Sequence, residues 1–231
     1  MSIFVFHDDL LICHSFNGDE LSSVEVLKKN EIADNKSQTS GEKQQIFIDS
    51  SRFTLVPNFV FLAAQATHYF SINFGNLRAN ERIYFTLNSA FEIVTVFSIE
   101  KQIDQFRSTL THSNTIDHFA QVVLKYLKIH VASGQPFLVI TPQNIYFSLK
   151  EESKLNQLSV GTYDNEDDVI YFLLAQLNSL GLPSISSINC CQLNEVKHFI
   201  IKDFTVKSQR INQFKDLNFM HVSPQHLFSV L

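Results

Sequence analysis

The chain has 231 residues, of which 45% are hydrophobic and 18% are charged, so it has enough apolar material for a core. This composition excludes a disordered chain, a collagen-like fibre and a small disulfide-stapled protein. The formal net charge of −5 argues against a nucleic-acid-binding protein that works by neutralising phosphates.

The N-terminal residues predict a cytoplasmic protein. Residues 1–8 have neither the basic region nor the long apolar stretch of a secretory signal. The longest uninterrupted apolar run, residues 59–64, is far shorter than the roughly 20 residues that span a bilayer. We therefore expect no insertion into a membrane.

The first half of the chain is predicted to begin with antiparallel strands. A turn at His7-Asp8-Asp9 separates the first two, and Asn17-Gly18 has the sequence of a type I′ turn before the third. Residues 28–45 are polar and are predicted to form a surface loop. The predicted strands are residues 3–6, 10–16, 21–27, 46–48 and 91–98, with an extended segment at 53–57; the predicted helices are residues 57–65, a short one ending at 106, and 115–127.

The second half is predicted to open in the same way. Residues 164–168 are mostly acidic and precede a run with helical spacing, so they are interpreted as a helix start, with Asp164 as N-cap. Gly181 and Pro183 are predicted to stop this helix. The predicted strands are residues 128–132, 137–141, 144–149, 186–190 and 218–222, with an extended piece ending at 160; the predicted helices are residues 169–180, 193–201 and 224–230.

The beginnings of the two halves can be aligned with each other. Residues 2–26 align without a gap with residues 136–160, and the turn at His7-Asp8-Asp9 then faces Thr141-Pro142-Gln143. Identity is low and hairpins are common, which leaves chance similarity as the alternative. The shared order of strands and helices predicts an α/β protein of two lobes, each a mixed sheet flanked by helices. The predicted lobes are residues 1–127 and 128–231.

Three further segments support a family resemblance. They are F-T-L-V-P at residues 53–57, D-V-I-Y-F-L-L at residues 168–174 and L-G-L at residues 180–182. Together with the paired hairpins they resemble domain-of-unknown-function family 3822, which occurs in Bacteroidota-type bacteria. That family is similar to actin-like ATPases, which have two ribonuclease-H-like lobes, and it has no assigned activity. The resemblance covers nearly the whole chain.

The resemblance implies two phosphate-binding hairpins, one in each lobe, with an Asp-x-Gly sequence at the turn. Glycine is needed there because the backbone approaches the phosphate closely, and the aspartate positions Mg²⁺. The corresponding positions are Asp8 and Asp9 in the first lobe and Pro142 and Gln143 in the second, and neither turn contains glycine. We therefore expect degenerate phosphate loops, no cofactor and no catalysis.

The preferred hypothesis is a non-catalytic actin-like protein that acts as a scaffold or assembly factor, with a protein partner or as a homo-oligomer. One alternative is a degenerate ATPase that still binds a nucleotide in the cleft between the lobes. A second alternative is an anion- or nucleic-acid-binding module. The basic residues for it would be Lys197, Lys202, Lys207, Arg210 and Lys215.

Neither a metal site nor a hydrolase site is predicted. Asp8 and Asp9 lack the converging carboxylates of a two-metal nuclease. No histidine pair has i,i+4 spacing with a nearby glutamate, so the nine histidines are interpreted as surface or capping residues. No G-x-S-x-G sequence is present. Cys13, Cys190 and Cys191 are interpreted as buried or idle thiols, with a vicinal Cys190–Cys191 disulfide or a redox sensor as the alternative.

Overall fold

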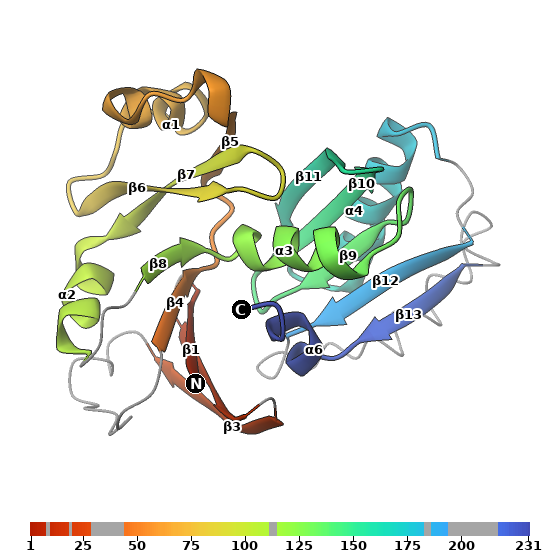
Figure 1. Cartoon of the computed structure of the whole chain (residues 1–231), viewed down its shortest axis with the longest axis horizontal. Helices are drawn as coiled ribbons and strands as arrows, with labels where there is room; N and C mark the ends of the chain where they lie inside the picture. The colour runs from red at the N-terminus through yellow and green to blue at the C-terminus, as the bar shows by residue number, and fades with distance from the viewer. Residues whose placement is uncertain (8–9, 19, 29–43, 111–114, 183–185, 194–216) are drawn as a thin grey trace. The chain divides into compact units, whose positions relative to one another are not determined.

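A computed structural model of the chain describes residues 1–231 except 8–9, 19, 29–43, 111–114, 183–185 and 194–216 (Figure 1). The chain divides into two compact units, residues 1–121 and 122–231. The division falls within helix α3 (Ala120–His130), whereas the sequence placed the boundary between the lobes after residue 127.

The main sheet of unit 1 has the strand order β3-β2-β1-β4-β8. Its strands are β1 (Ser2–Phe6), β2 (Leu10–Asn17), β3 (Glu20–Lys28), β4 (Gln44–Ile48) and β8 (Thr115–His118). Strands β1, β2 and β3 pair antiparallel, whereas β4 and β8 extend the sheet in parallel with β1. All residues of β1 are buried, as expected of a central strand that is covered on both faces.

The sheet of unit 2 has the equivalent strand order, β11-β10-β9-β12-β13. Its strands are β9 (Phe137–Ile140), β10 (Asn144–Glu151), β11 (Lys154–Thr162), β12 (Ser187–Gln192) and β13 (Asn218–Val222). The strand directions also match, with two antiparallel and two parallel pairings. The gap-free alignment of the two halves maps β2 onto β10 and β3 onto β11 end to end, so the predicted repeat is confirmed.

The repeat extends to local irregularities. The pairing of β2 with β3 shifts register between Ser15 and Phe16, and that of β10 with β11 shifts at the aligned positions, between Leu149 and Lys150. The two hairpin turns also match, since Gly18 has φ +63° and its equivalent Glu152 has φ +53°. Glycine adopts this left-handed conformation freely because it has no Cβ, whereas glutamate is strained there.

Replacing Glu152 with glycine is therefore expected to raise the free energy of unfolding by about 0.5–1 kcal/mol, because the left-handed strain is removed. The matched control is Gly18→Ala, which should lower it by a similar amount, because no atom lies within 4 Å of the added Cβ and only the backbone strain counts. Urea unfolding measures both. A destabilising Glu152→Gly would contradict the assignment of strain at this turn.

Unit 1 carries an insertion between β4 and β8 (Figure 1). Its antiparallel sheet has the order β5-β7-β6, with η2, η3 and α1 between β5 and β6 and with α2 after β7. These elements are β5 (Phe53–Pro57), η2 (Asn58–Val60), η3 (Ala63–Gln65), α1 (Ala66–Phe74), β6 (Glu81–Asn88), β7 (Ile93–Glu100) and α2 (Lys101–Thr109).

The equivalent faces of the two main sheets are covered by different elements. In unit 2, Leu138 and Ile140 of β9 pack with apolar residues of α4 (Glu166–Ser179). In unit 1, the equivalent Phe4 and Phe6 pack with β7 and α2, and the ring of Phe106 on α2 meets both at 5.3–5.4 Å between centroids. The insertion therefore supplies in unit 1 the cover that a helix supplies in unit 2.

The N-cap of α4 lies one residue later than predicted. The side chain of Asn165 accepts hydrogen bonds from the backbone N–H groups of Asp167 and Asp168, at 2.9 and 3.2 Å. The Asp168 carboxylate accepts in return from the backbone N–H of Asn165, which completes a capping box. Asp164 is therefore not the N-cap, although the acidic residues do cap the helix start as predicted.

Three other predicted elements are wrong. Residues 57–65 form the end of β5 and two short 3-10 helices, and the regular helix α1 follows them. Residues 115–118 form the strand β8, which pairs in parallel with β4, and α3 begins only at Ala120, whose N–H is accepted by His118. Residues 128–130 continue α3, so no strand begins there. Strand β6 was not predicted. The C-terminal helix is α6 (Pro224–Phe228), which ends two residues earlier than predicted. The predicted helix at 193–201 lies almost wholly outside the described residues.

Candidate functional site

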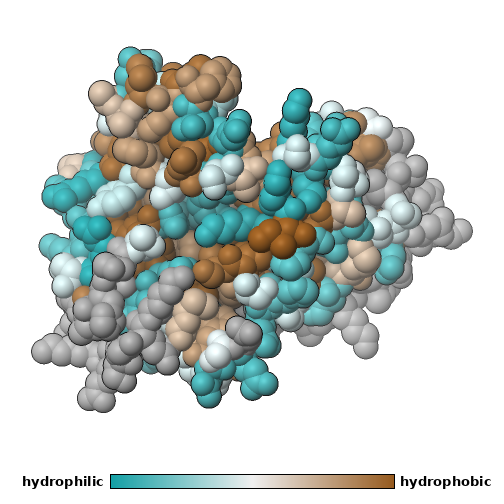
Figure 2. Space-filling model, viewed as in Figure 1, coloured by the Kyte–Doolittle hydropathy of each residue, from teal (hydrophilic) through white to brown (hydrophobic). Residues whose placement is uncertain are grey.

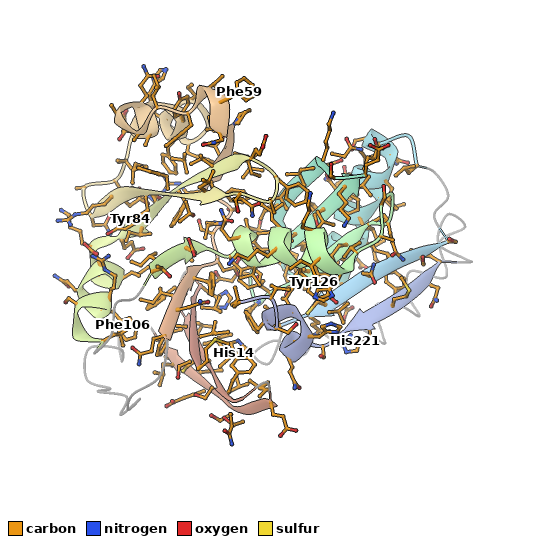
Figure 3. All side chains as sticks on the ribbon, viewed as in Figure 1. His14, Phe59, Tyr84, Phe106, Tyr126 and His221 are labelled. Carbon is orange, nitrogen blue, oxygen red and sulfur yellow. The ribbon has the colours of Figure 1, made fainter. Side chains whose placement is uncertain are left out.

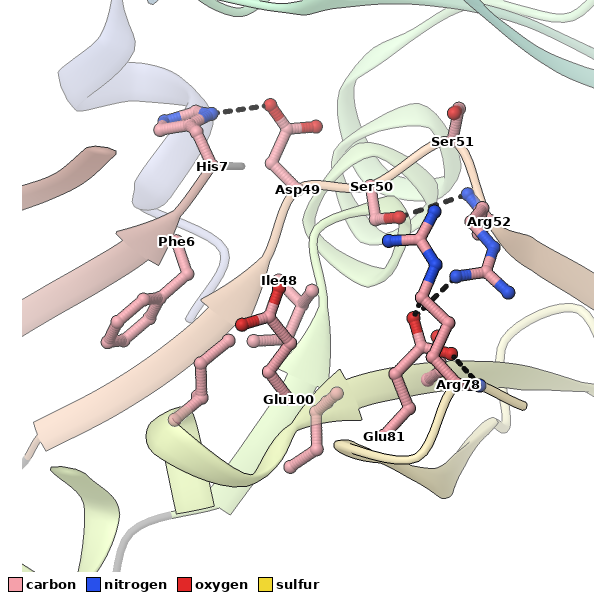
Figure 4. A pocket seen from close by; sticks show the side chains of 13 residues that line it. Phe6, His7, Ile48, Asp49, Ser50, Ser51, Arg52, Arg78, Glu81 and Glu100 are labelled. Carbon is pink, nitrogen blue, oxygen red and sulfur yellow. Dashed lines mark hydrogen bonds and ion pairs between the residues drawn. The ribbon is translucent and has the colours of Figure 1, made fainter. Parts of the chain in front are cut away.

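The candidate site is a polar cavity in unit 1, at the ends of the parallel strands β1 and β4 (Figure 4). Ligands of open α/β sheets bind outside the carboxyl ends of strands, where neighbouring strands connect in opposite directions. Strands β1 and β4 are neighbours at such a place. The chain continues from β1 to β2 on one side of the pair, and the next strand of this sheet after β4 is β8, on the other side. The cavity has a volume of about 380 Å³ and also borders β6, β7 and α2.

A buried His7–Asp49 pair forms one wall of the cavity. The Nδ1 atom of His7 lies 2.7 Å from Oδ2 of Asp49, and the two side chains are 1% and 0% exposed. The strand register places them together, since Phe6 of β1 faces Ile48 of β4 and His7 and Asp49 follow directly. The backbone N–H of Asp49 also donates to the carbonyl of Phe6, at 2.8 Å. The His7 ring therefore contributes a short contact to a carboxylate that is buried away from water.

One arginine of the cavity is paired with a carboxylate. Arg52 forms an ion pair with Glu81 and lies over the ring of Phe70, 5.2 Å from its centroid. Glu81 also accepts the backbone N–H of Arg78 at 3.0 Å, and the Arg78 side chain lies 4.0 Å from the same carboxylate. Glu81 therefore holds the Arg52 guanidinium, whereas the Arg78 side chain is 69% exposed and lies only at the outer limit of an ion pair.

His118 supports the cavity wall from behind. Its ring is fully buried; Nε2 donates to the carbonyl of Ser50 at 2.9 Å, and Nδ1 accepts the backbone N–H of Ala120 at 3.1 Å. These two bonds require the neutral ring with its proton on Nε2. Burial lowers the pKa of His118 to about 4, although the charge of Asp49 raises it. His118 therefore positions the segment after β4 and stays neutral at physiological pH.

The turn between β9 and β10 holds the predicted positions Pro142 and Gln143. The backbone N–H of Thr141 donates to the carbonyl of Asn144 at 2.9 Å. The Thr141 hydroxyl oxygen accepts the N–H groups of Asn144 and Gln143, at 2.9 and 3.4 Å. The carbonyl of Thr141 accepts the hydroxyl of Tyr163 at 2.6 Å. Proline has no N–H, so the donors of this turn are bound within it.

The turn between β1 and β2 has the same backbone hydrogen bond as the turn between β9 and β10, but the side chain of its first residue has a different partner. The N–H of His7 donates to the carbonyl of Leu10 at 2.8 Å, at positions equivalent to Thr141 and Asn144. The His7 side chain turns to Asp49, whereas that of Thr141 caps its own turn. The predicted positions Asp8 and Asp9 lie outside the described residues.

The cysteines are free, buried thiols, as predicted. Cys190 and Cys191 follow one another on β12 and form no disulfide. Burial raises the pKa of all three thiols, that of Cys13 to about 11, so they remain protonated. Within the described ranges, no group of three or more His, Cys, Asp or Glu side chains is placed to hold a metal ion.

The interpretation of the histidines as surface or capping residues is wrong for His7 and His14, which are buried with exposures of 3%. His118 is also buried, but it accepts the N–H of Ala120 at the start of α3, as a capping residue does. His14 lies on a buried position of β2, and burial together with the charge of His7 lowers its pKa to about 4. The basic residues of the nucleic-acid alternative, from Lys197 to Lys215, lie outside the described residues.

Comparisons with known proteins identify the fold. A family model described as "Protein of unknown function (DUF3822)" matches residues 3–186. A crystal structure from Bacteroides thetaiotaomicron VPI-5482, of a protein with actin-like ATPase fold and unknown function, is 16% identical, with a TM-score of 0.74, over 95% of this chain and 90% of that one. A PilM-PilN type IV pilus biogenesis complex is 11% identical, with a TM-score of 0.55, over 98% of this chain and 91% of the matched chain.

No curated protein matches the chain in sequence. At these identities the structural neighbours show the fold alone: the chain has the actin-like ATPase fold, as predicted. In the part of the chain that the structure describes, no helix is long and apolar enough to cross a membrane.

Proposed function

The chain belongs to the DUF3822 family of proteins of unknown function, and we propose that it is a non-catalytic protein that acts as a scaffold or assembly factor by binding another protein. The observation that carries this proposal is the turn between β9 and β10. In an actin-like ATPase the second phosphate-binding hairpin is expected at this position.

Phosphate recognition at a hairpin turn needs backbone N–H groups that are free to point at the ligand. Here Pro142 has none, and the N–H groups of Gln143 and Asn144 are accepted by the Thr141 hydroxyl. A phosphate would have to displace that hydroxyl, and the Cβ atoms at positions 142 and 143 oppose its close approach.

The other unit supports the same proposal. Arg52 of its cavity is already paired with Glu81, so a polyphosphate would have to compete with a carboxylate for this arginine. The similar fold of a PilM-PilN complex adds that a protein of this architecture can work in complex with another protein. That likeness supports a binding role without nucleotide chemistry for this chain.

Isothermal titration calorimetry with ATP and Mg²⁺ tests the proposal. We expect no binding heat for the wild-type chain, while an actin-like ATPase titrated in the same buffer gives a normal isotherm. Binding with a micromolar Kd would overturn the proposal in favour of the degenerate ATPase. Retention on heparin that is lost when Lys197, Lys202 and Lys207 are replaced by glutamine would overturn it in favour of the anion-binding module.

A further inference from the structure

Two histidines of unit 2 lie side by side on its surface. His130 is the last residue of α3, and His226 lies on the short helix α6. The centroids of their rings are 5.0 Å apart, and the ring planes are inclined at 68°. Both residues are exposed, and Figure 2 shows hydrophilic side chains among hydrophobic ones over the face that holds α3 and α6. The pair is therefore open to solvent and to dissolved ions.

The ring of Tyr126 contacts both imidazole rings. Its centroid lies 4.8 Å from that of His130 and 5.5 Å from that of His226. Tyr126, which Figure 3 labels on α3, is 4% exposed and packs in turn against the ring of Phe137 at 4.9 Å. Two exposed rings that rest on a buried ring have less conformational freedom to lose when they bind an ion.

The backbone that carries His226 is also held in place. The hydroxyl oxygen of Ser223, the N-cap of α6, accepts the backbone N–H of His226 at 3.2 Å. The next two residues, Leu227 and Phe228, are 0% and 1% exposed, so they anchor this helix in the core. His226 is therefore presented to His130 from a helix that is both capped and anchored.

The distance between the two rings fits a shared metal ion. Zn²⁺ binds histidine nitrogens at about 2.0–2.1 Å in a tetrahedral arrangement. A ring centroid then lies about 3.2 Å from the metal, and two ligands at a tetrahedral angle have centroids about 5.2 Å apart. The observed separation of 5.0 Å agrees with this value. Rotation about χ2, which is a soft torsion in histidine, turns a nitrogen of each exposed ring toward the ion.

The charges next to the pair are compatible with a cation. His130 ends α3, where the unpaired carbonyl groups carry the negative end of the helix dipole and favour positive charge. Lys128, two residues earlier, donates from Nζ to the carbonyl of Ser153 at 2.8 Å, so its ammonium group is directed to the turn between β10 and β11. The local field therefore does not oppose binding of a metal ion at His130.

We propose that His130 and His226 together bind one divalent transition metal ion, such as Zn²⁺, with water in its remaining coordination positions. Imidazole nitrogen suits Zn²⁺, Cu²⁺ and Ni²⁺, whereas Mg²⁺ and Ca²⁺ prefer oxygen ligands. Across the part of the chain that the structure describes, no third His, Cys, Asp or Glu side chain joins the pair, so the site keeps open positions. The site goes beyond the proposed function, because neither hairpin turn nor the cavity of unit 1 takes part in it.

Isothermal titration calorimetry of the full chain with ZnCl₂, without a polyhistidine tag and at a pH where histidine is neutral, tests the proposal. We expect Zn²⁺ to bind, and its affinity to fall at least about tenfold in His130→Gln and in His226→Gln, since even the loss of a group that only orients a metal ligand costs 10–100-fold. The matched control is His221→Gln, which removes an exposed histidine from β13, the strand that precedes α6, and should leave the affinity unchanged. MgCl₂ should give no binding heat.

Four results would overturn the proposal. The absence of binding heat at millimolar Zn²⁺ would show that the pair does not bind this ion. Equal affinity of the wild type and both variants would show an adventitious ion held elsewhere in the chain. Equal weakening by His221→Gln would show that surface histidines act without pairing, and binding of Mg²⁺ at the same affinity would show an oxygen site. The titration with ATP contains no transition metal ion, so failure of the proposed function is distinguished from failure of this proposal.

Discussion

Replacing His7 with phenylalanine is expected to lower the free energy of unfolding by about 2–3 kcal/mol, because the buried Asp49 carboxylate loses its 2.7 Å contact with the His7 ring. The phenyl ring is larger than the imidazole, so the substitution leaves no cavity, and the loss reports the missing 2.7 Å contact together with any strain from the added volume. Urea unfolding at neutral pH, followed by circular dichroism, measures the change. We expect a lower midpoint with an unchanged slope.

Two variants control for this interpretation. Asp49→Asn keeps a polar side chain beside His7 without a buried charge and should cost less than His7→Phe. The double variant His7→Phe with Asp49→Leu should recover most of the loss, because an apolar pair can replace a buried ion pair without leaving a charge behind. A cost below about 1 kcal/mol for His7→Phe would show that Asp49 does not depend on it.

Acid is expected to destabilise unit 1 through His14 and His118. The pKa of each lies near 4 in the folded chain and near 6.5 when unfolded, so the unfolded chain binds protons first. The contribution of each neutral histidine to the free energy of unfolding is fully present above pH 6.5 and is lost as the pH falls from 6.5 to 4. Between pH 7 and pH 5 each histidine should remove about 2 kcal/mol from the free energy of unfolding.

Glutamine variants isolate this effect from the titration of carboxylates. His118→Gln and His14→Gln should each lower the free energy of unfolding at pH 7 but make its decrease between pH 7 and pH 5 smaller by about 2 kcal/mol. His68→Gln provides the matched control for the substitution itself, because His68 is exposed on α1 and its replacement should leave the free energy of unfolding at pH 7 unchanged. Parallel curves for wild type and both buried-histidine variants would contradict the prediction.

The antiparallel hairpins of the two main sheets could be predicted because their signals are local. The apolar start of β2, the Asn17-Gly18 turn and the return of the same pattern in the second half each depend on neighbours in sequence. Strand β8 was missed because its Ile116 also fits the apolar stripe of the helix that follows it. Strand β6 was missed because one side of the strand is only half-buried, so its exposed Phe85 and Leu87 break the expected alternation.

The candidate site could be predicted only in part. The lack of glycine at Pro142 and Gln143 was visible in the sequence, but the hydrogen bonds of Thr141 that close this turn were not. His7 and Asp49 are 42 residues apart, and only the parallel pairing of β1 with β4 brings them together. Non-local pairing of this kind leaves no spacing signal in a single sequence.

Unit 1 cannot be shortened by removing its insertion, because the insertion covers one face of the main sheet. A truncation that excises residues 53–109 would expose Phe4 and Phe6 to water, because the inserted strand β7 and helix α2 shield that side of the sheet. A shortened unit 1 would therefore need an added helix with the apolar pattern of α4. In unit 2, Val169, Leu173 and Leu177 of that helix cover Leu138 and Ile140, which are equivalent to Phe4 and Phe6.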